Sequence, residues 1–443
     1  MESKTFIRIG LIAAMVIVCG LCGLTAYATF DWLTGSVPVW VVWDNGGQSG
    51  QATETLTYTA VPALEIRTDA GDVTVTAADV DEIEVEAVKT AWAPTTEEAE
   101  AAAAALTFRV VETADTLSLV YDKPDELNLG WRAGPDTIDF IVRVPAEISV
   151  DLQTSIGKIT VSGLTGVVKL DSDFGAIEAE DLIGPLEVGS SNGSVTLTRI
   201  QAGEGEVSAD TRFGEIVLED VTAGSVTVQS SNGPITIGSV MALEAVLVGN
   251  QFGDIDLSDV HAATLEIRND NGRIVLEGGE IGELVSATNR FGDVEVIGVQ
   301  ATAYELWASN GDLTVEGAAG SLTLETAFGD ITVTASSPVT LDIQCSNGRI
   351  QVTGPLAATA HTIRNAFGDI TLTIPGDSAF DLVLETEFGD IRSEIPLSVT
   401  GSLDSGSERD RWEAAANGGG PRLEATTSNG DVIILVLPEP AGE

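Results

Sequence analysis

Three observations predict an all-β protein, a single-chain parallel β-solenoid (β-helix) whose rungs are about 19–20 residues long. A turn motif containing glycine recurs along the chain, and apolar residues alternate with polar ones on both sides of it. Gly supplies 47 of 443 residues and aromatic residues only 5%, which suits short strands and tight turns. We expect right-handed coiling, a transmembrane helix at the N-terminus and one short helix in the N-terminal cap.

An apolar run at the N-terminus predicts a membrane anchor. Ile9–Ala28 is long enough to cross a bilayer as a helix. Lys4 and Arg8 precede it and place the N-terminus in the cytoplasm. The alternative is a cleaved signal peptide, because Ala26-Tyr27-Ala28 fits a small-x-small cleavage site. Either interpretation exports residues 45–443.

The segment that follows the anchor predicts a cap on the solenoid. Asp69-Ala70-Gly71-Asp72-Val73 is an early version of the repeated turn. Thr95-Thr96-Glu97-Glu98 matches a capping box and predicts a helix near 96–106. Strands are expected near 107–111, 117–121 and 138–144. The predicted organisation is 1–30 cytoplasmic tip and anchor, 31–52 juxtamembrane linker, 53–150 cap, 151–400 solenoid repeats, 401–422 loop insertion and 423–443 final rung and tail.

The repeated turn has two alternating forms, Phe-Gly-acid and Asn-Gly. Glycine is expected where the chain needs positive φ, and Ile, Val or Leu occupies alternate positions on either side. A single pair of such strands cannot bury its apolar face alone, so rungs must stack. The turn residues are Phe213, Gly214, Asn232, Gly233, Phe252, Gly253, Asn271, Gly272, Phe291, Gly292, Asn310, Gly311, Phe328, Gly329, Asn347, Gly348, Phe367, Gly368, Phe388, Gly389, Asn429 and Gly430.

The length of one rung decides which turn residues stack. If one rung is about 19 residues, Phe and Asn turns alternate in a single column. If it is about 39 residues, Phe stacks on Phe, and the acids that follow Gly also stack. Carboxylates at strand spacing repel, whereas the short rung places Arg273 and Arg349 between acids, so we favour the short rung. The long rung would suit Ca²⁺, with weak candidate ligands Asp254, Asp293, Asp330 and Asp369.

The C-terminal region interrupts the repeat and then returns to it. Residues 402–421 are rich in Ser, Gly and charge. The pattern of Leu423–Leu437 then predicts one last rung, and we expect its apolar end to close the stack.

The net charge of the chain limits the kinds of molecule that it can bind. The formal net charge is −47, from 21 Lys+Arg and 68 Asp+Glu. Binding to nucleic acid depends on clustered cations, so no nucleic-acid partner is expected. Cationic partners, divalent metal or solubility alone remain compatible with this surface. The three cysteines, Cys19, Cys22 and Cys345, have neither disulfide nor zinc spacing.

The sequence offers no catalytic constellation, so we predict that the protein is not an enzyme. Acids are distributed over every rung rather than gathered at one site. His261 and His361 lie far apart in corners between strands. Asp342 and Cys345 near His361 would suggest a thiol site, but no orienting pattern accompanies them. We predict no catalytic or cofactor-binding residues, and no cofactor other than the Ca²⁺ considered above.

The alternating Ser-Asn-Gly and Phe-Gly-Asp turns, each followed by Ile-x-Val/Leu, resemble the putative-adhesin family of bacterial and archaeal β-strand-repeat proteins. The likeness covers roughly residues 60–437. It implies an extracytoplasmic single-chain β-helix whose function is largely undefined, and it supplies no catalytic residues. The resemblance also implies a link, in some relatives, to cell-envelope stress responses.

These observations favour a non-catalytic scaffold at the cell surface, adhesive, structural or binding. The alternative is a cell-envelope stress sensor or regulator that binds cationic peptides or a membrane partner. A more remote alternative is a polysaccharide-active β-helix enzyme. The expected partners are the membrane, through the N-terminal helix, and a surface, peptide or protein ligand, with end-to-end homo-oligomers as an option. The expected location is the cell membrane in a single pass, or the exterior after signal cleavage.

Overall fold

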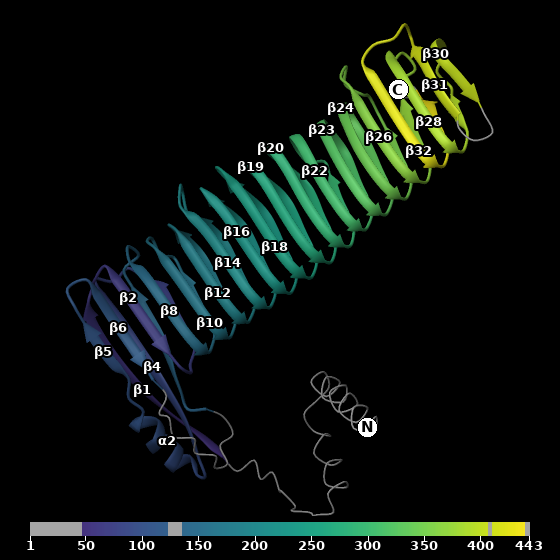
Figure 1. Cartoon of the computed structure of the whole chain (residues 1–443). Coiled ribbons are helices and arrows are strands. Elements are labelled where there is room, and N and C mark those ends of the chain that lie inside the picture. Colours follow the sequence, from purple (N-terminus) through teal and green to yellow (C-terminus); the bar gives the residue numbers. More distant parts are fainter. Residues whose placement is uncertain (1–46, 123–134, 406–409, 439–443) are drawn as a thin grey trace, which may run out of the picture. The chain divides into compact units, whose positions relative to one another are not determined.

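The computed structural model describes residues 47–122, 135–405 and 410–438. Over these residues the chain is a parallel β-solenoid, with successive strands stacked side by side (Figure 1). A typical rung consists of β16 (Ser225–Asn232), a turn at Gly233 and β17 (Ile235–Ala242). Each strand pairs in parallel with its equivalents in the rungs before and after it. The sequence prediction of an all-β parallel solenoid is confirmed.

The register shows that the short rung is the correct one. In the first-strand stack, Phe213 pairs with Asn232, and Asn232 pairs with Phe252. The two turn forms therefore alternate in one column. The same register continues from Phe252 to Asn271 and on to Phe291.

The remaining strands of the stack fall into three groups. The other first strands are β8 (Ser149–Ile156), β10 (Val168–Phe174), β12 (Leu186–Asn192), β14 (Glu206–Phe213), β18 (Ala245–Phe252), β22 (Gln300–Asn310) and β26 (His361–Phe367). The other second strands are β9 (Ile159–Ser162), β11 (Ile177–Ile183), β13 (Val195–Gln201), β15 (Ile216–Ala223), β21 (Val294–Ile297), β25 (Ile350–Thr353) and β27 (Ile370–Ile374). Strands that run continuously from one rung into the next are β19 (Ile255–Asn271), β20 (Ile274–Phe291), β23 (Leu313–Phe328) and β24 (Ile331–Asn347).

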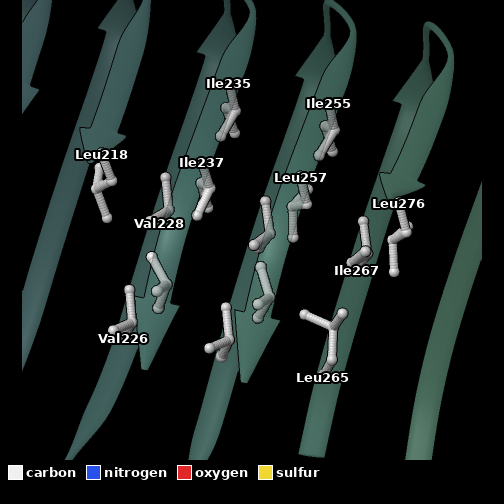
Figure 2. Close-up of a cluster of buried hydrophobic side chains, with 14 of the residues drawn as sticks. Leu218, Val226, Val228, Ile235, Ile237, Ile255, Leu257, Leu265, Ile267 and Leu276 are labelled. Carbon is white, nitrogen blue, oxygen red and sulfur yellow. The ribbon is translucent and has the colours of Figure 1, made fainter. Parts of the chain in front are cut away.

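The core lies inside the rungs and repeats with them. Alternate residues of each strand are buried, as the period-two pattern predicts. Parallel pairing places equivalent side chains beside one another on successive rungs. Figure 2 shows this for Ile237, Leu257 and Leu276, which follow one another in register. The core is therefore a set of apolar columns.

The N-terminal end is built out of chain order. β2 (Ala63–Thr68) and β3 (Val73–Ala77) pair on one side with β8 and β9. On the other side they pair with β6 (Thr116–Tyr121) and β7 (Thr137–Val144), which come later in the sequence. The outermost strands then turn antiparallel. They are β4 (Glu82–Ala93) on β7, β1 (Gln48–Thr59) on β4, and β5 (Arg109–Glu112) on β6.

The predicted short helix is present as α2 (Thr96–Ala105). Its N-cap is Thr95, whose side chain accepts a hydrogen bond from the Glu98 backbone N–H at 3.3 Å, as the capping box predicts. The helix packs against β1 and β4. A Cβ at Gly50 of β1 would collide with the helix backbone at Glu100, so glycine permits this close approach.

The C-terminal end differs from the sequence expectation. β32 (Arg422–Asn429) and β33 (Val432–Val436) do not close the stack. They lie between β26/β27 on one side and β28 (Phe380–Phe388) and β29 (Ile391–Ser393) on the other. Rungs with the same turn motif offer the same backbone pairing, so the motif alone does not indicate their order.

The segment expected as a loop, 401–422, contains strand structure. β31 (Asp410–Ala416) pairs antiparallel with β28 and with β30 (Leu397–Ser405). These strands cover the edge of β28, so the outer rung is capped by antiparallel pairing. Edge strands covered in this way expose fewer unpaired backbone groups.

The apolar run Ile9–Ala28 lies outside the described residues. Within the described part of the chain, no helix is both long and apolar enough to span a membrane.

Candidate interaction surface

The most regular surface of the solenoid is the side on which the glycine turns stack, which we call the turn edge. It has three parallel columns. Glycine forms the central one, Phe or Asn precedes it, and an acid or another polar residue usually follows it. The opposite side, where second strands lead into the next rung, we call the far edge.

Glycine is required at the turn edge by lack of space. Gly272 has φ of 130°, and a Cβ there would fall on the carbonyl of Gly253 in the rung below. A Cβ at Gly253 would in turn collide with Gly233. The collision is with backbone, which cannot rotate away as a side chain can. A substitution here would therefore push neighbouring rungs apart.

A buried polar ladder supports these turns from inside. It occupies the position two residues before Phe or Asn. Asn289 shows its role, because its side-chain amide donates to the carbonyls of Gly272 at 2.8 Å and Gly292 at 2.9 Å. The other ladder residues that donate to a turn glycine are Thr154, Ser172, Thr211, Asn250, Asn269, Thr326, Cys345, Asn365, Thr386 and Thr427. This ladder was not predicted from the sequence, although small polar residues recur there.

The acids after glycine also have a structural role. Asp293 accepts a hydrogen bond from the backbone N–H of Asp312 at 2.8 Å, and Asp312 accepts one from Asp330 at 2.7 Å. Each acid thus holds the turn of the next rung. Arg349 lies between acids as expected, but Asp293, Asp312 and Asp330 stack without an interposed cation. The backbone hydrogen bonds offset the repulsion that is expected between carboxylates at strand spacing.

The weak calcium candidates lie in this acid column, on alternate rungs. Asp254 accepts from the backbone N–H of Arg273 at 2.8 Å, and Asp369 accepts from that of Asp431 at 2.8 Å. Arg349 pairs with Asp330, with 2.7 Å between the charged groups. Among the described residues, no group of three or more His, Cys, Asp or Glu is placed to hold a metal. Calcium binding stays a prediction.

The phenylalanines of the turn edge are exposed rather than buried. Their exposed fractions lie between 47% and 64%, although most other large apolar side chains of the solenoid are buried. They recur on every second rung, with asparagine between. The column comprises Phe174, Phe213, Phe252, Phe291, Phe328, Phe367 and Phe388.

The family model described as Toastrack DUF4097 matches this chain over residues 61–316 and again over 283–435. The chain belongs to this family. The match spans the rungs that carry the turn edge and confirms the resemblance inferred from the turn motifs. No curated protein matches the sequence.

Solved structures similar to this Toastrack protein share little sequence with it. A putative adhesin from Bacteroides fragilis is 15% identical, covering 60% of this chain and 95% of its own, with a TM-score of 0.30. A putative cell adhesion protein from Clostridium sporogenes is 7% identical, covering 87% and 100%, with a TM-score of 0.16. A putative lipid binding protein from Parabacteroides distasonis is 12% identical, covering 62% and 97%, with a TM-score of 0.32. Family membership rests on the family model alone.

The groups considered for thiol chemistry do not converge in this Toastrack protein. Cys345 belongs to the buried polar ladder at the turn edge, and burial raises the pKa of its thiol to about 11. His361 is buried beside Leu341, nearer the far edge, and contacts the backbone of Leu341 and Ala357. Asp342 lies on β24, the strand that also carries Cys345, and pairs in register with Thr362 of β26, the residue after His361. Among the residues that the structure describes, no base is placed to activate the Cys345 thiol, and the pKa of this thiol is raised rather than lowered.

The far edge carries the second histidine. His261 lies 3.0 Å from Asp259, and both line a shallow groove of about 430 Å³. Asp259 has positive φ, as do the equivalent non-glycine residues of the four preceding rungs. These are Asp181, Arg199, Asp220 and Ser239.

Proposed function

We propose that this Toastrack protein is a non-catalytic binding scaffold displayed outside the membrane, and that the turn edge is its contact surface. The observation that carries the proposal is the column of exposed phenylalanines. Exposed apolar side chains scattered singly need no explanation. These rings are not scattered, because they recur at one position on every second rung, and we take this regularity as support for a contact surface.

The fold itself does not require these aromatic rings. Asparagine occupies the same position on alternate rungs and forms the same turn, so the turn is compatible with a polar side chain. Phe252 nevertheless remains 53% exposed between Asn232 and Asn271. A ring that the turn does not need, and that water disfavours, fits a role in contact with a partner.

Display outside the membrane is supported by the apolar run Ile9–Ala28 and the cations before it. A test is to label intact source cells that carry Asn310→Cys with a membrane-impermeant maleimide. Asn310 is exposed on the turn edge, whereas Cys345 of the parent chain is buried. We expect labelling of the variant and little of the parent. Labelling only after the cells are opened would contradict external display.

The contact surface is tested by site-specific photo-crosslinking in the same cells. A photoreactive phenylalanine analogue replaces Phe252 or Phe291 in the full-length chain, and Leu247 is the matched control. Leu247 is 40% exposed but lies on the strand face, away from the turn. We expect discrete adducts from the two turn positions and not from Leu247. Equal adducts at all three positions, or none, would remove the turn edge as the contact surface.

A further inference from the structure

Six of the seven phenylalanine rungs also carry an acid on the same turn, two residues further on. The exception is Phe174, because Ala176 stands at that position. We call each such pair a Phe–acid doublet. The asparagine rungs carry no such constant partner, because Ser, Pro, Arg or Asp occupies the equivalent position. The doublets are Phe213/Glu215, Phe252/Asp254, Phe291/Asp293, Phe328/Asp330, Phe367/Asp369 and Phe388/Asp390.

A Phe–acid doublet has the chemistry to bind a cation. The face of an aromatic ring attracts an ammonium or guanidinium group, and the carboxylate adds a charged hydrogen-bond acceptor. The formal net charge of −47 attracts such groups to the surface from a distance. The repeat of the doublet therefore indicates a ligand with a repeating positive charge.

Three consecutive doublets are open to a ligand. The carboxylates of Glu215, Asp254 and Asp293 make no ion pair with any residue that the structure describes. Asp254 and Asp293 each use one oxygen for the backbone N–H of the next rung, at 2.8 Å in both cases, and keep the other.

The next doublet along the stack is closed. Asp330 is paired with Arg349, whose guanidinium lies 2.7 Å from its second oxygen. At the C-terminal end, Asp390 is likewise paired with Arg392 at 2.7 Å. The stack thus contains open doublets, whose acids have no ion pair among the described residues, and closed doublets, whose acids are paired with arginine.

Spacing selects the conformation of the ligand. Strands stack about 4.8 Å apart, so doublets on every second rung lie about 9.6 Å apart. A polyproline II helix advances about 9.3 Å in its three-residue turn and places every third side chain on one face. In an extended strand, side chains on one face are about 6.7 Å apart. An α-helix offers its closest match only at every seventh residue, about 10.5 Å apart.

We propose that the turn edge binds a cationic polyproline II segment with a basic residue at every third position, its cations seated on the doublets of Phe213, Phe252 and Phe291. This inference rests on the proposed function and names the partner class for the same surface. Polyproline II segments bind aromatic surfaces with little loss of conformational entropy, because they are already extended.

The test compares fluorescent peptides that each carry six lysines, at three different spacings. The full-length chain in mild detergent is titrated with (Lys-Pro-Pro)₆, with (Lys-Pro)₆ and with (Lys-Pro-Pro-Pro)₆, using fluorescence anisotropy at low and moderate salt. We expect the three-residue spacing to bind about tenfold more tightly than the other two, as three cation–aromatic contacts permit. Equal affinity for all three peptides would reduce the surface to a non-specific polyanion and overturn the proposal.

Two variants sharpen the result. Phe213→Leu/Phe252→Leu/Phe291→Leu keeps apolar side chains but removes the ring faces, and we expect it to lose the tenfold preference. Arg349→Gln opens the Phe328 doublet, and we expect it to raise the affinity for (Lys-Pro-Pro)₆ by about threefold. Thermal unfolding checks that both variants are folded. An unchanged preference in the triple variant would overturn the proposal.

Failure of this inference is distinguishable from failure of the proposed function. If Phe252 crosslinks in cells while the peptides show no preference for spacing, the contact surface stands and the ligand class is wrong. If neither experiment gives a signal, the turn edge is not the contact surface.

Discussion

The two edges of the solenoid both use positive φ, but for different physical reasons. At the turn edge, a Cβ on Gly272 would meet the backbone of the previous rung. At the far edge, Gly298 has φ of 65° with no heavy atom within 4 Å of an added Cβ. The equivalent far-edge position in an earlier rung is occupied by Asp259, with φ of 52°.

The comparison separates the two requirements that glycine meets. The turn edge requires both the backbone conformation and the empty space, so it accepts only glycine. The far-edge position of Asp259 and Gly298 requires only the conformation, which Asp, Ser or Arg adopts at a modest cost. Elsewhere on this edge space is also limiting, because a Cβ at Gly279 would collide with the backbone of Val260. From Gly157 to Gly389 the turn glycines are 18 to 21 residues apart, and the turns themselves have constant length, so the variation falls outside them. The turn edge therefore fixes the register between rungs, and the variation in rung length lies outside the turns.

The largest expected effect comes from adding one methyl group at each edge. Gly272→Ala should lower the free energy of unfolding by about 3 kcal/mol or more, because both strain and backbone overlap act on it. Gly298→Ala should cost only about 1–2 kcal/mol, the penalty of positive φ alone. Chemical denaturation of the two variants measures the difference. Similar losses would mean that the edges are not distinct.

An intermediate effect is expected from the ladder that lies behind the turn edge. Asn289→Ala leaves the carbonyls of Gly272 and Gly292 without their side-chain donor, so we expect a loss of about 1–3 kcal/mol in the free energy of unfolding. Asn289→Thr should recover part of it, since Thr326 donates to Gly311 from the same position. A loss equal in both variants would show that the amide acts through packing instead.

The smallest effect concerns His361, outside the turn edge. Burial lowers its pKa, and its ring accepts the Leu341 N–H at 3.2 Å while facing the Ala357 carbonyl at 2.9 Å. The unfolded chain therefore binds a proton more readily than the folded one. Stability should fall as pH drops below the unfolded pKa of about 6.5 and on toward the lower folded pKa. His361→Gln should flatten this slope in denaturation curves measured between pH 7 and 5. An unchanged slope would assign the pH dependence to other groups.

The structure of one rung could be predicted from the sequence, because each part of the rung has a local sequence pattern. Glycine marks the turn, and alternating apolar residues mark the strands on either side. Repulsion between carboxylates also favoured the correct rung length, although Asp312 in fact lies between Asp293 and Asp330 where a cation was expected. Hydrogen bonds from the backbone hold these acids together, and they become visible only once the register is known.

The order of the rungs at the two ends had no such local pattern. The buried polar ladder had one, but it was not recognised. The order of rungs at the two ends depends on which equivalent strands pair, and the alternating apolar pattern that these strands share does not decide it. The buried ladder was within reach, because Asn250, Asn269 and Asn289 stand at the same distance before successive turns. Polar residues at an otherwise apolar period are read as exposed until their hydrogen-bond partners are known.

The position of β32 and β33 has a consequence for synthesis of the chain. They are made after all four strands that flank them, yet they lie between those strands. While residues 422–436 are still within the ribosome, β26 and β28 have no shared neighbour and the last rungs cannot be joined. The C-terminal end of the solenoid can therefore be completed only after residues 422–436 have been made, and not by stepwise growth in chain order.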